Sequence, residues 1–176
     1  WMFHLLRGEY ASALELADEM LALAERDGRP TVLVEGHVDR GLVHMYLGEF
    51  DAARAHLEAA VAGYQPPDRP DHVYEAQGDS GVGALANLAP VLWNLGYLDE
   101  ARERSDLSLE RAEGVGGPVT RAQAWGMRSI FHLMRAEPVE LAQWVHKTHA
   151  HSVDHDLGYW RTVSSLLSGW VLGRAG

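Results

Sequence analysis

The fold is decided by one short sequence motif, Tyr46-Leu47-Gly48-Glu49-Phe50. Related phrases recur along the chain around a central small residue, which serves as an anchor: Gly8, Gly48, Gly96, Ala136 and the final Gly176. The anchors are separated by 40, 48, 40 and 40 residues. A regular period of 20 to 50 residues is typical of arrays built from one repeated supersecondary unit. The chain is therefore expected to contain tandem copies of a single unit.

Each copy has the pattern of a helical hairpin. After the anchor Gly48, apolar residues at 50, 53, 57 and 60 mark one face of a helix. The anchor supplies the backbone freedom that a tight turn between two helices needs. Seven residues before the anchor stands a small residue in four of the five copies, as at Gly41, and this allows two helices to approach closely. The repeat predicts an all-α fold, an α-solenoid of tandem antiparallel helical hairpins.

The spacing of glycines, prolines and apolar residues predicts about nine helices, over 1–8, 10–26, 30–47, 50–64, 80–95, 98–114, 118–135, 138–155 and 158–174. Asp79 or Ser80 is expected to cap the helix that begins near residue 80. The one longer period contains a proline-rich stretch, so an insertion loop is expected near 65–79. Pro90 falls inside a predicted helix, where it should cause a kink or remove a hydrogen bond.

The chain resembles a tetratricopeptide-repeat array. The matching residues are Gly41, Gly48, Phe50, Ala53, Leu57 and Ala60, although the usual period is 34 residues. Residues 74–79 and 92–101 further resemble the maltose-regulator-like repeat region of large bacterial signalling proteins, among them predicted ATPases, adenylate cyclases and transcriptional activators. The resemblance implies a TPR-like superhelix with a regulatory role in signal transduction. Residues 1–176 are interpreted as a single repeat domain cut from a longer protein, with any ATPase or cyclase module upstream of Trp1.

Composition narrows the classes of partner. The 25 acidic and 15 basic residues give a formal net charge of -10, which argues against binding to nucleic acid or to an anionic membrane surface. The sequence has no apolar run of about 20 residues and no basic-then-apolar leader, so a cytoplasmic location is expected. The chain has no cysteine, which excludes disulfides, thiolate zinc sites and cysteine nucleophiles.

No motif for catalysis or for a cofactor stands out in the sequence. The phosphate-binding pattern G-x-x-x-x-G-K-[ST] is missing, and the glycine-rich stretch 78–83 is better interpreted as the start of a helix. The carboxylates are spread over expected helix surfaces and suggest no catalytic pair. We therefore expect no catalytic residue, no cofactor and no enzymatic activity.

Histidines are numerous, and four of the 10 fall within 146–155. His151 and His155 lie one helical turn apart, so they are weak candidates for a metal site. No H-E-x-x-H motif accompanies them, and an exposed helix end is the favoured interpretation.

Three further histidines stand four residues before an anchor: His4, His44 and His132. A residue that recurs at one repeat position usually has one structural job. We expect these three to be half-buried packing residues that donate a hydrogen bond to a neighbouring backbone group.

In the family that the chain resembles, the first helix of each hairpin lines a concave groove. Transferred through the anchors, the resemblance implies a groove for a partner or ligand formed by Met2, Leu5, Leu42, Met45, Tyr46, Trp93, Asn94, Ile130, Leu133, Met134 and Trp170. This set is strongly apolar and lacks the basic clamp that would capture a peptide carboxylate. The sequence leaves open whether the groove is accessible or filled as core.

Two functions follow from this pattern. The first is a non-catalytic protein-interaction or intramolecular regulatory scaffold, whose partner is a protein, a peptide or another domain of the parent protein. The alternative is a small-molecule effector-sensing domain, in which a ligand in the groove changes the curvature of the solenoid. Self-association through exposed repeat ends also stays open.

Overall fold

A computed structural model of the chain describes residues 1–65 and 78–175. Over these ranges the fold consists of nine α-helices and contains no strand: α1 (Met2–Leu6), α2 (Tyr10–Arg26), α3 (Pro30–Leu47), α4 (Phe50–Gly63), α5 (Ser80–Asn94), α6 (Leu98–Val115), α7 (Pro118–Met134), α8 (Pro138–Asp154) and α9 (Gly158–Ala175). The predicted all-α class is confirmed. Each predicted helix boundary lies within two residues of the observed one. Most of the predicted insertion loop lies outside the described residues.

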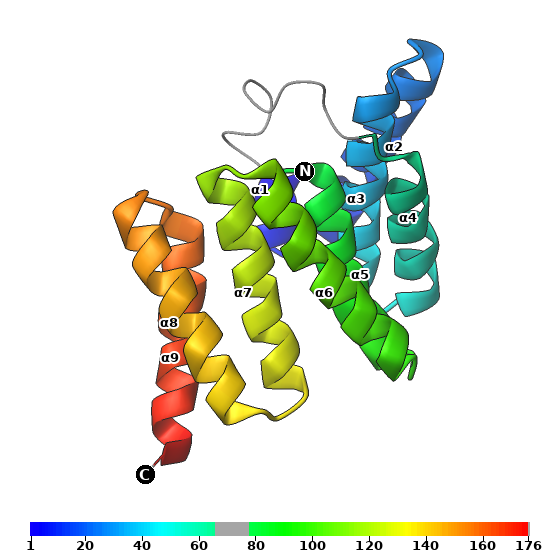
Figure 1. Cartoon of the computed structure of the whole chain (residues 1–176). Helices are drawn as coiled ribbons and strands as arrows, with labels where there is room; N and C mark the ends of the chain where they lie inside the picture. The colour runs from blue at the N-terminus through cyan, green and yellow to red at the C-terminus, as the bar shows by residue number, and fades with distance from the viewer. Residues whose placement is uncertain (66–77, 176) are drawn as a thin grey trace.

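The helices form hairpins that stack side by side. Within the hairpins, α3 packs against α4, α5 against α6, and α7 against α8. Between hairpins, α3 contacts α5, α5 contacts α7, and α7 contacts α9. Figure 1 shows this series running from the blue and cyan helices to the orange and red ones. We call α3, α5, α7 and α9 the odd layer, and their surface turned away from the even-numbered helices the odd face.

Helix α5 lies at the centre of the stack. All of its residues from 81 to 92 are buried, because α3, α4, α6 and α7 all pack against it. The largest apolar cluster joins Leu57 of α4 and Leu88 of α5 to Phe131 of α7, and so it crosses three hairpins. Helix α5 stays continuous through Pro90, and the Asn94 side-chain amide donates a hydrogen bond of 2.8 Å to the Pro90 carbonyl.

The anchors close the turns as the sequence predicts. Gly48 follows α3 with a φ of 78°, a left-handed conformation that favours glycine. Ala136 takes the same region with a φ of 55°. Gly41 lies against the next helix, since a Cβ atom there would meet Leu57 Cγ at 2.7 Å. The small residue before the anchor therefore allows the close helix approach that the repeat requires.

Asp79 fixes the start of α5 and confirms the predicted cap. Its Oδ1 atom accepts a hydrogen bond of 2.8 Å from the Val82 amide, and Oδ2 accepts one of 2.7 Å from the Tyr64 hydroxyl. The Asp79 amide donates to Thr120 Oγ1 at 3.1 Å. One fully buried residue thus joins the end of α4, the start of α5 and the start of α7. The glycine-rich stretch is a helix start, as interpreted from the sequence.

We expect Asp79→Ala to lower the free energy of unfolding by about 2 kcal/mol, because the helix cap is lost and the Tyr64 hydroxyl loses its acceptor. Urea denaturation followed by circular dichroism measures this change. Glu103→Ala, on the exposed side of α6, is the matched control and should change stability by less than about 0.5 kcal/mol. Equal effects of the two substitutions would contradict the assigned role of Asp79.

Candidate functional site

The eleven predicted groove residues lie on α1, α3, α5, α7 and α9. Their exposure differs. Tyr46 is 51% exposed and Met2 is 46% exposed, whereas Leu5 is buried at 6%. Asn94 is exposed, and the other members of the set are half-buried: Leu42, Met45, Trp93, Ile130, Leu133, Met134 and Trp170.

Several of the half-buried members also support the core. Met45 and Trp93 pack against the cluster around Phe131, and the Trp93 and Phe131 rings meet edge-on at 5.7 Å between centroids. Leu42 contacts two apolar clusters. A small hollow lies elsewhere, lined by Val34, Tyr64 and Ser80 among others, near the start of α5. The odd layer therefore combines packing residues with exposed ones.

The structure adds a polar feature that the sequence did not single out. Asp39 of α3 is only 7% exposed, and no residue in the described ranges donates a hydrogen bond to its carboxyl group. Burial raises the pKa of Asp39 to about 8, the negative charge of Glu35 adds to this, and the α-amino group of Trp1 acts in the opposite direction. Burial also raises the pKa of Glu35, against the effect of Arg29.

One of the two equivalent positions on α5 and one on α7 is polar as well, whereas Gly83 and Met127 occupy the other two. Asp39 and Asn87 each stand nine residues before their anchors, while Glu35 and Gln123 each stand thirteen before theirs. Asn87 is 4% exposed and donates from its amide nitrogen to the Gly83 carbonyl at 2.8 Å. The Oε1 atom of Gln123 is buried without a hydrogen-bond partner. We call Glu35, Asp39, Asn87 and Gln123 the acceptor row.

Glycine brings Gln123 close to α5. A Cβ atom on Gly83, which occupies the position equivalent to Glu35 and Gln123, would lie 2.9 Å from the Gln123 side-chain nitrogen. The missing side chain therefore lets the Gln123 amide of α7 lie against the start of α5, with its nitrogen beside Gly83 and its oxygen beside Gly78. The sequence carried a signal for this row, namely polar residues at fixed distances before the anchors, but the transfer of family positions selected mainly apolar ones.

Tyrosines gather near the end of α3. Burial raises the pKa of Tyr46, with Tyr10 contributing, and burial raises the pKa of Tyr159, with Tyr46 contributing. Tyr46 and Tyr159 are 51% and 49% exposed. Tyrosine rings offer a face that attracts cations.

Two stretches of the chain, residues 34–59 and 82–106, match the model of the tetratricopeptide repeat family. The first covers most of α3 and α4, and the second runs from α5 into α6, so each match spans an odd helix, its anchor and part or most of the following helix. Over these two stretches the chain is similar to the tetratricopeptide repeat. No curated protein matches the chain. Such repeats generally mediate protein–protein interaction and typically form non-catalytic scaffolds.

The length and hydropathy of the helices decide whether one of them could span a membrane. In the described part of the chain, none of them is both long enough and apolar enough to cross a bilayer.

The three histidines that stand four residues before an anchor each make a side-chain hydrogen bond. The prediction that they donate to a backbone group is wrong. Each Nδ1 donates to the carboxylate five residues later, at 2.6 to 2.7 Å, and not to a backbone group: His4 to Glu9, His44 to Glu49, and His132 to Glu137. Each glutamate is the first residue before the next helix. The left-handed anchor folds the chain back so that these two side chains meet across the turn. The expected partial burial is confirmed for His4 and His44, whereas His132 is fully buried.

A second group of histidines joins α3 to α4. The Nδ1 atoms of His37 and His56 lie 3.0 Å apart, so one ring donates a hydrogen bond to the other. The His44 ring stacks on His56 with 5.6 Å between the ring centroids. Burial, together with the nearby charges of Arg40, His37 and His44, lowers the pKa of His56 to about 4. Burial also lowers the pKa of His37.

We expect His56 to make the fold less stable in acid. Its pKa in the folded chain lies below the unfolded value of 6.5, so its contribution is present above pH 6.5 and is lost as the pH falls toward 4. Between pH 7 and pH 5 the loss should reach about 1–2 kcal/mol. His56→Gln should remove this part of the pH dependence in urea denaturation, whereas His146→Gln, at an exposed site, should leave it unchanged. Identical pH profiles of the two variants would contradict this account.

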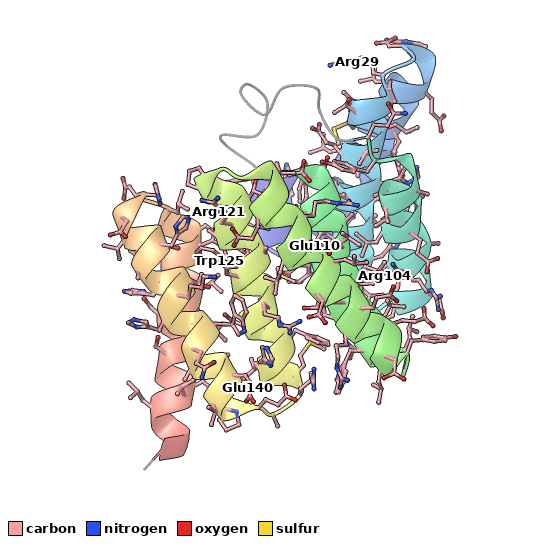
Figure 2. The ribbon with its side chains drawn as sticks, viewed as in Figure 1. Arg29, Arg104, Glu110, Arg121, Trp125 and Glu140 are labelled. Atoms are coloured by element: carbon pink, nitrogen blue, oxygen red, sulfur yellow. The ribbon has the colours of Figure 1, made fainter. Side chains whose placement is uncertain are left out.

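The histidine-rich end of α8 is held in the interface with α7. The His151 and His155 rings lie 4.4 Å apart, and His151 Nε2 donates to the Pro118 carbonyl at 2.9 Å. Figure 2 shows Trp125 between α7 and α8, where its ring meets the edge of His151 at 4.9 Å and Lys147 Nζ at 3.9 Å. The described ranges contain no group of three or more side chains placed to hold a metal ion.

Proposed function

We propose that the chain is a non-catalytic scaffold that binds a protein, a peptide or another domain of its parent protein on the odd face. The observation that supports this proposal is the contact of α3 with α5, of α5 with α7 and of α7 with α9, because it brings the first helices of successive hairpins side by side. The odd face includes solvent-exposed side chains, such as Tyr46 and Asn94. Half-buried aromatic and methionine side chains beside them, such as Trp93 and Met134, suit contact with a protein partner.

We further propose that this scaffold is a regulatory domain of a large bacterial signalling protein in the cytoplasm. Support comes from the resemblance of residues 74–79 and 92–101 to repeat regions of predicted ATPases, adenylate cyclases and transcriptional activators. In such a protein the odd face would contact either a separate partner or the module that it regulates.

Site-specific photocrosslinking in cells tests the proposed face. A photoreactive phenylalanine analogue replaces Tyr46 on the odd layer in one variant and Glu103 on the exposed side of α6 in another. We expect a discrete protein adduct, or an adduct within the parent protein, from position 46 and not from position 103. Adducts from position 103 alone, or from neither position, would contradict the proposed binding face.

A further inference from the structure

We propose that the acceptor row binds a lysine or arginine side chain from a basic peptide segment of a protein partner. The inference rests on the proposed scaffold function, because it names the chemistry of the segment that the odd face takes. The ligand class follows from the groups on three neighbouring helices of the odd layer, each of which is considered in turn below.

Asp39 supplies the first argument. A carboxyl group that is 7% exposed and has no hydrogen-bond donor among the described residues is unfavourable in a folded protein. A bound cation would supply both the opposite charge and the missing donors. Glu35, one helical turn earlier, lies on the same side of α3 and adds a second carboxylate.

Gln123 supplies an independent argument from another helix. Its Oε1 atom is a buried acceptor without a partner, and its side chain lies against Gly83 of α5. Asn87 uses its amide nitrogen for the Gly83 carbonyl, which leaves its oxygen as an acceptor. The row therefore offers acceptors and needs donors. An arginine guanidinium brings five N–H groups and a lysine ammonium brings three, whereas a carboxylate or phosphate brings none when ionised.

The surroundings suit an extended basic segment. Tyr46 lies seven residues beyond Asp39 on α3, a distance of about 10 Å along the helix. Three residues of an extended peptide span about the same length. The half-exposed rings of Tyr46 and Tyr159 can then contact a second basic or apolar side chain of that segment. The formal net charge of -10 attracts such a segment over longer distances.

Selection from a random library of twelve-residue peptides displayed on phage tests the inference, with the 176-residue chain as bait at pH 8.5. We expect the enriched peptides to share a lysine or arginine. For a synthetic enriched peptide, fluorescence anisotropy should show binding at least about tenfold weaker to Asp39→Asn than to the wild-type chain. Glu103→Gln removes one acidic group from exposed α6 and should bind within about twofold of wild type. Circular dichroism melting confirms that each variant is folded.

Three results would overturn the inference, and they separate it from the proposed function. Enriched peptides without basic residues, bound equally by wild type and Asp39→Asn, would reject the cation site and leave the scaffold standing. Basic peptides bound equally by Asp39→Asn and Glu103→Gln would indicate only general attraction to an acidic protein. Failure to enrich any peptide would reject the peptide site, while the crosslinking result at Tyr46 would decide the scaffold function by itself.

Discussion

The Phe131→Ala variant should unfold with a free energy about 3–5 kcal/mol below that of the wild-type chain. Phe131 is 1% exposed and packs with Leu57, Leu88 and Leu92, so its removal leaves a cavity where three hairpins meet. The ring also supports Trp93 through an edge-on contact. Urea denaturation followed by circular dichroism at 222 nm measures the loss.

Val139→Ala is the control for this prediction, because Val139 is 65% exposed on α8. It should change the free energy of unfolding by less than about 0.5 kcal/mol. A Phe131→Ala variant within about 1 kcal/mol of wild type would show that the cluster does not hold the hairpins together.

The second large effect has the opposite sign. Asp39→Asn should raise the free energy of unfolding at pH 9 by about 2–5 kcal/mol, and should have little effect near pH 4. In the folded chain burial raises the pKa of Asp39 to about 8, above the ordinary value of 3.8 for an aspartate side chain. The contribution of the protonated carboxyl is therefore fully present below about pH 4 and is lost as the pH rises through about 8. Asparagine does not titrate and avoids this loss.

Urea denaturation of wild type, Asp39→Asn and Glu103→Gln at pH 5, 7 and 9 measures this effect. The stability gained by Asp39→Asn should grow with pH, and that of Glu103→Gln should stay near zero. A constant difference across the three pH values would contradict the assigned state of Asp39. Residues that lower folding stability are common at functional sites, where binding competes with folding stability. Asp39 is such a residue on the proposed binding face.

Much of the fold could be predicted from the sequence because its boundaries depend on local chemistry. Glycine at the anchors fixes left-handed turns, and Pro30, Pro118 and Pro138 each begin a helix at the position that proline favours. Asp79 or Ser80 was predicted as a cap from residue type and place alone, and Asp79 is the cap in the structure. Each of these signals depends on only a few neighbouring residues. The helix boundaries could therefore be predicted without knowing how the hairpins stack.

The features that the sequence did not predict depend on contacts across turns and between hairpins. The partner of His44 is Glu49, and only the folded turn brings the two side chains together. Asp39 has the sequence pattern of an ordinary polar helix residue, and its burial follows from how closely the neighbouring hairpins pack. Trp93 was expected in a groove, yet it also packs on Phe131. The curvature of a solenoid is set by side-chain sizes at each helix interface, which the repeat period does not specify.

The most direct test of the odd face as a binding surface is nuclear magnetic resonance of the isotope-labelled chain, titrated with an enriched peptide. The side-chain amides of Asn87 and Gln123 and the backbone amide of Asp39 report on the acceptor row from three different helices. The account predicts that the largest chemical-shift changes occur at these groups and along α3, α5 and α7. Changes concentrated on the exposed sides of α4, α6 and α8, with the acceptor row unaffected, would contradict it.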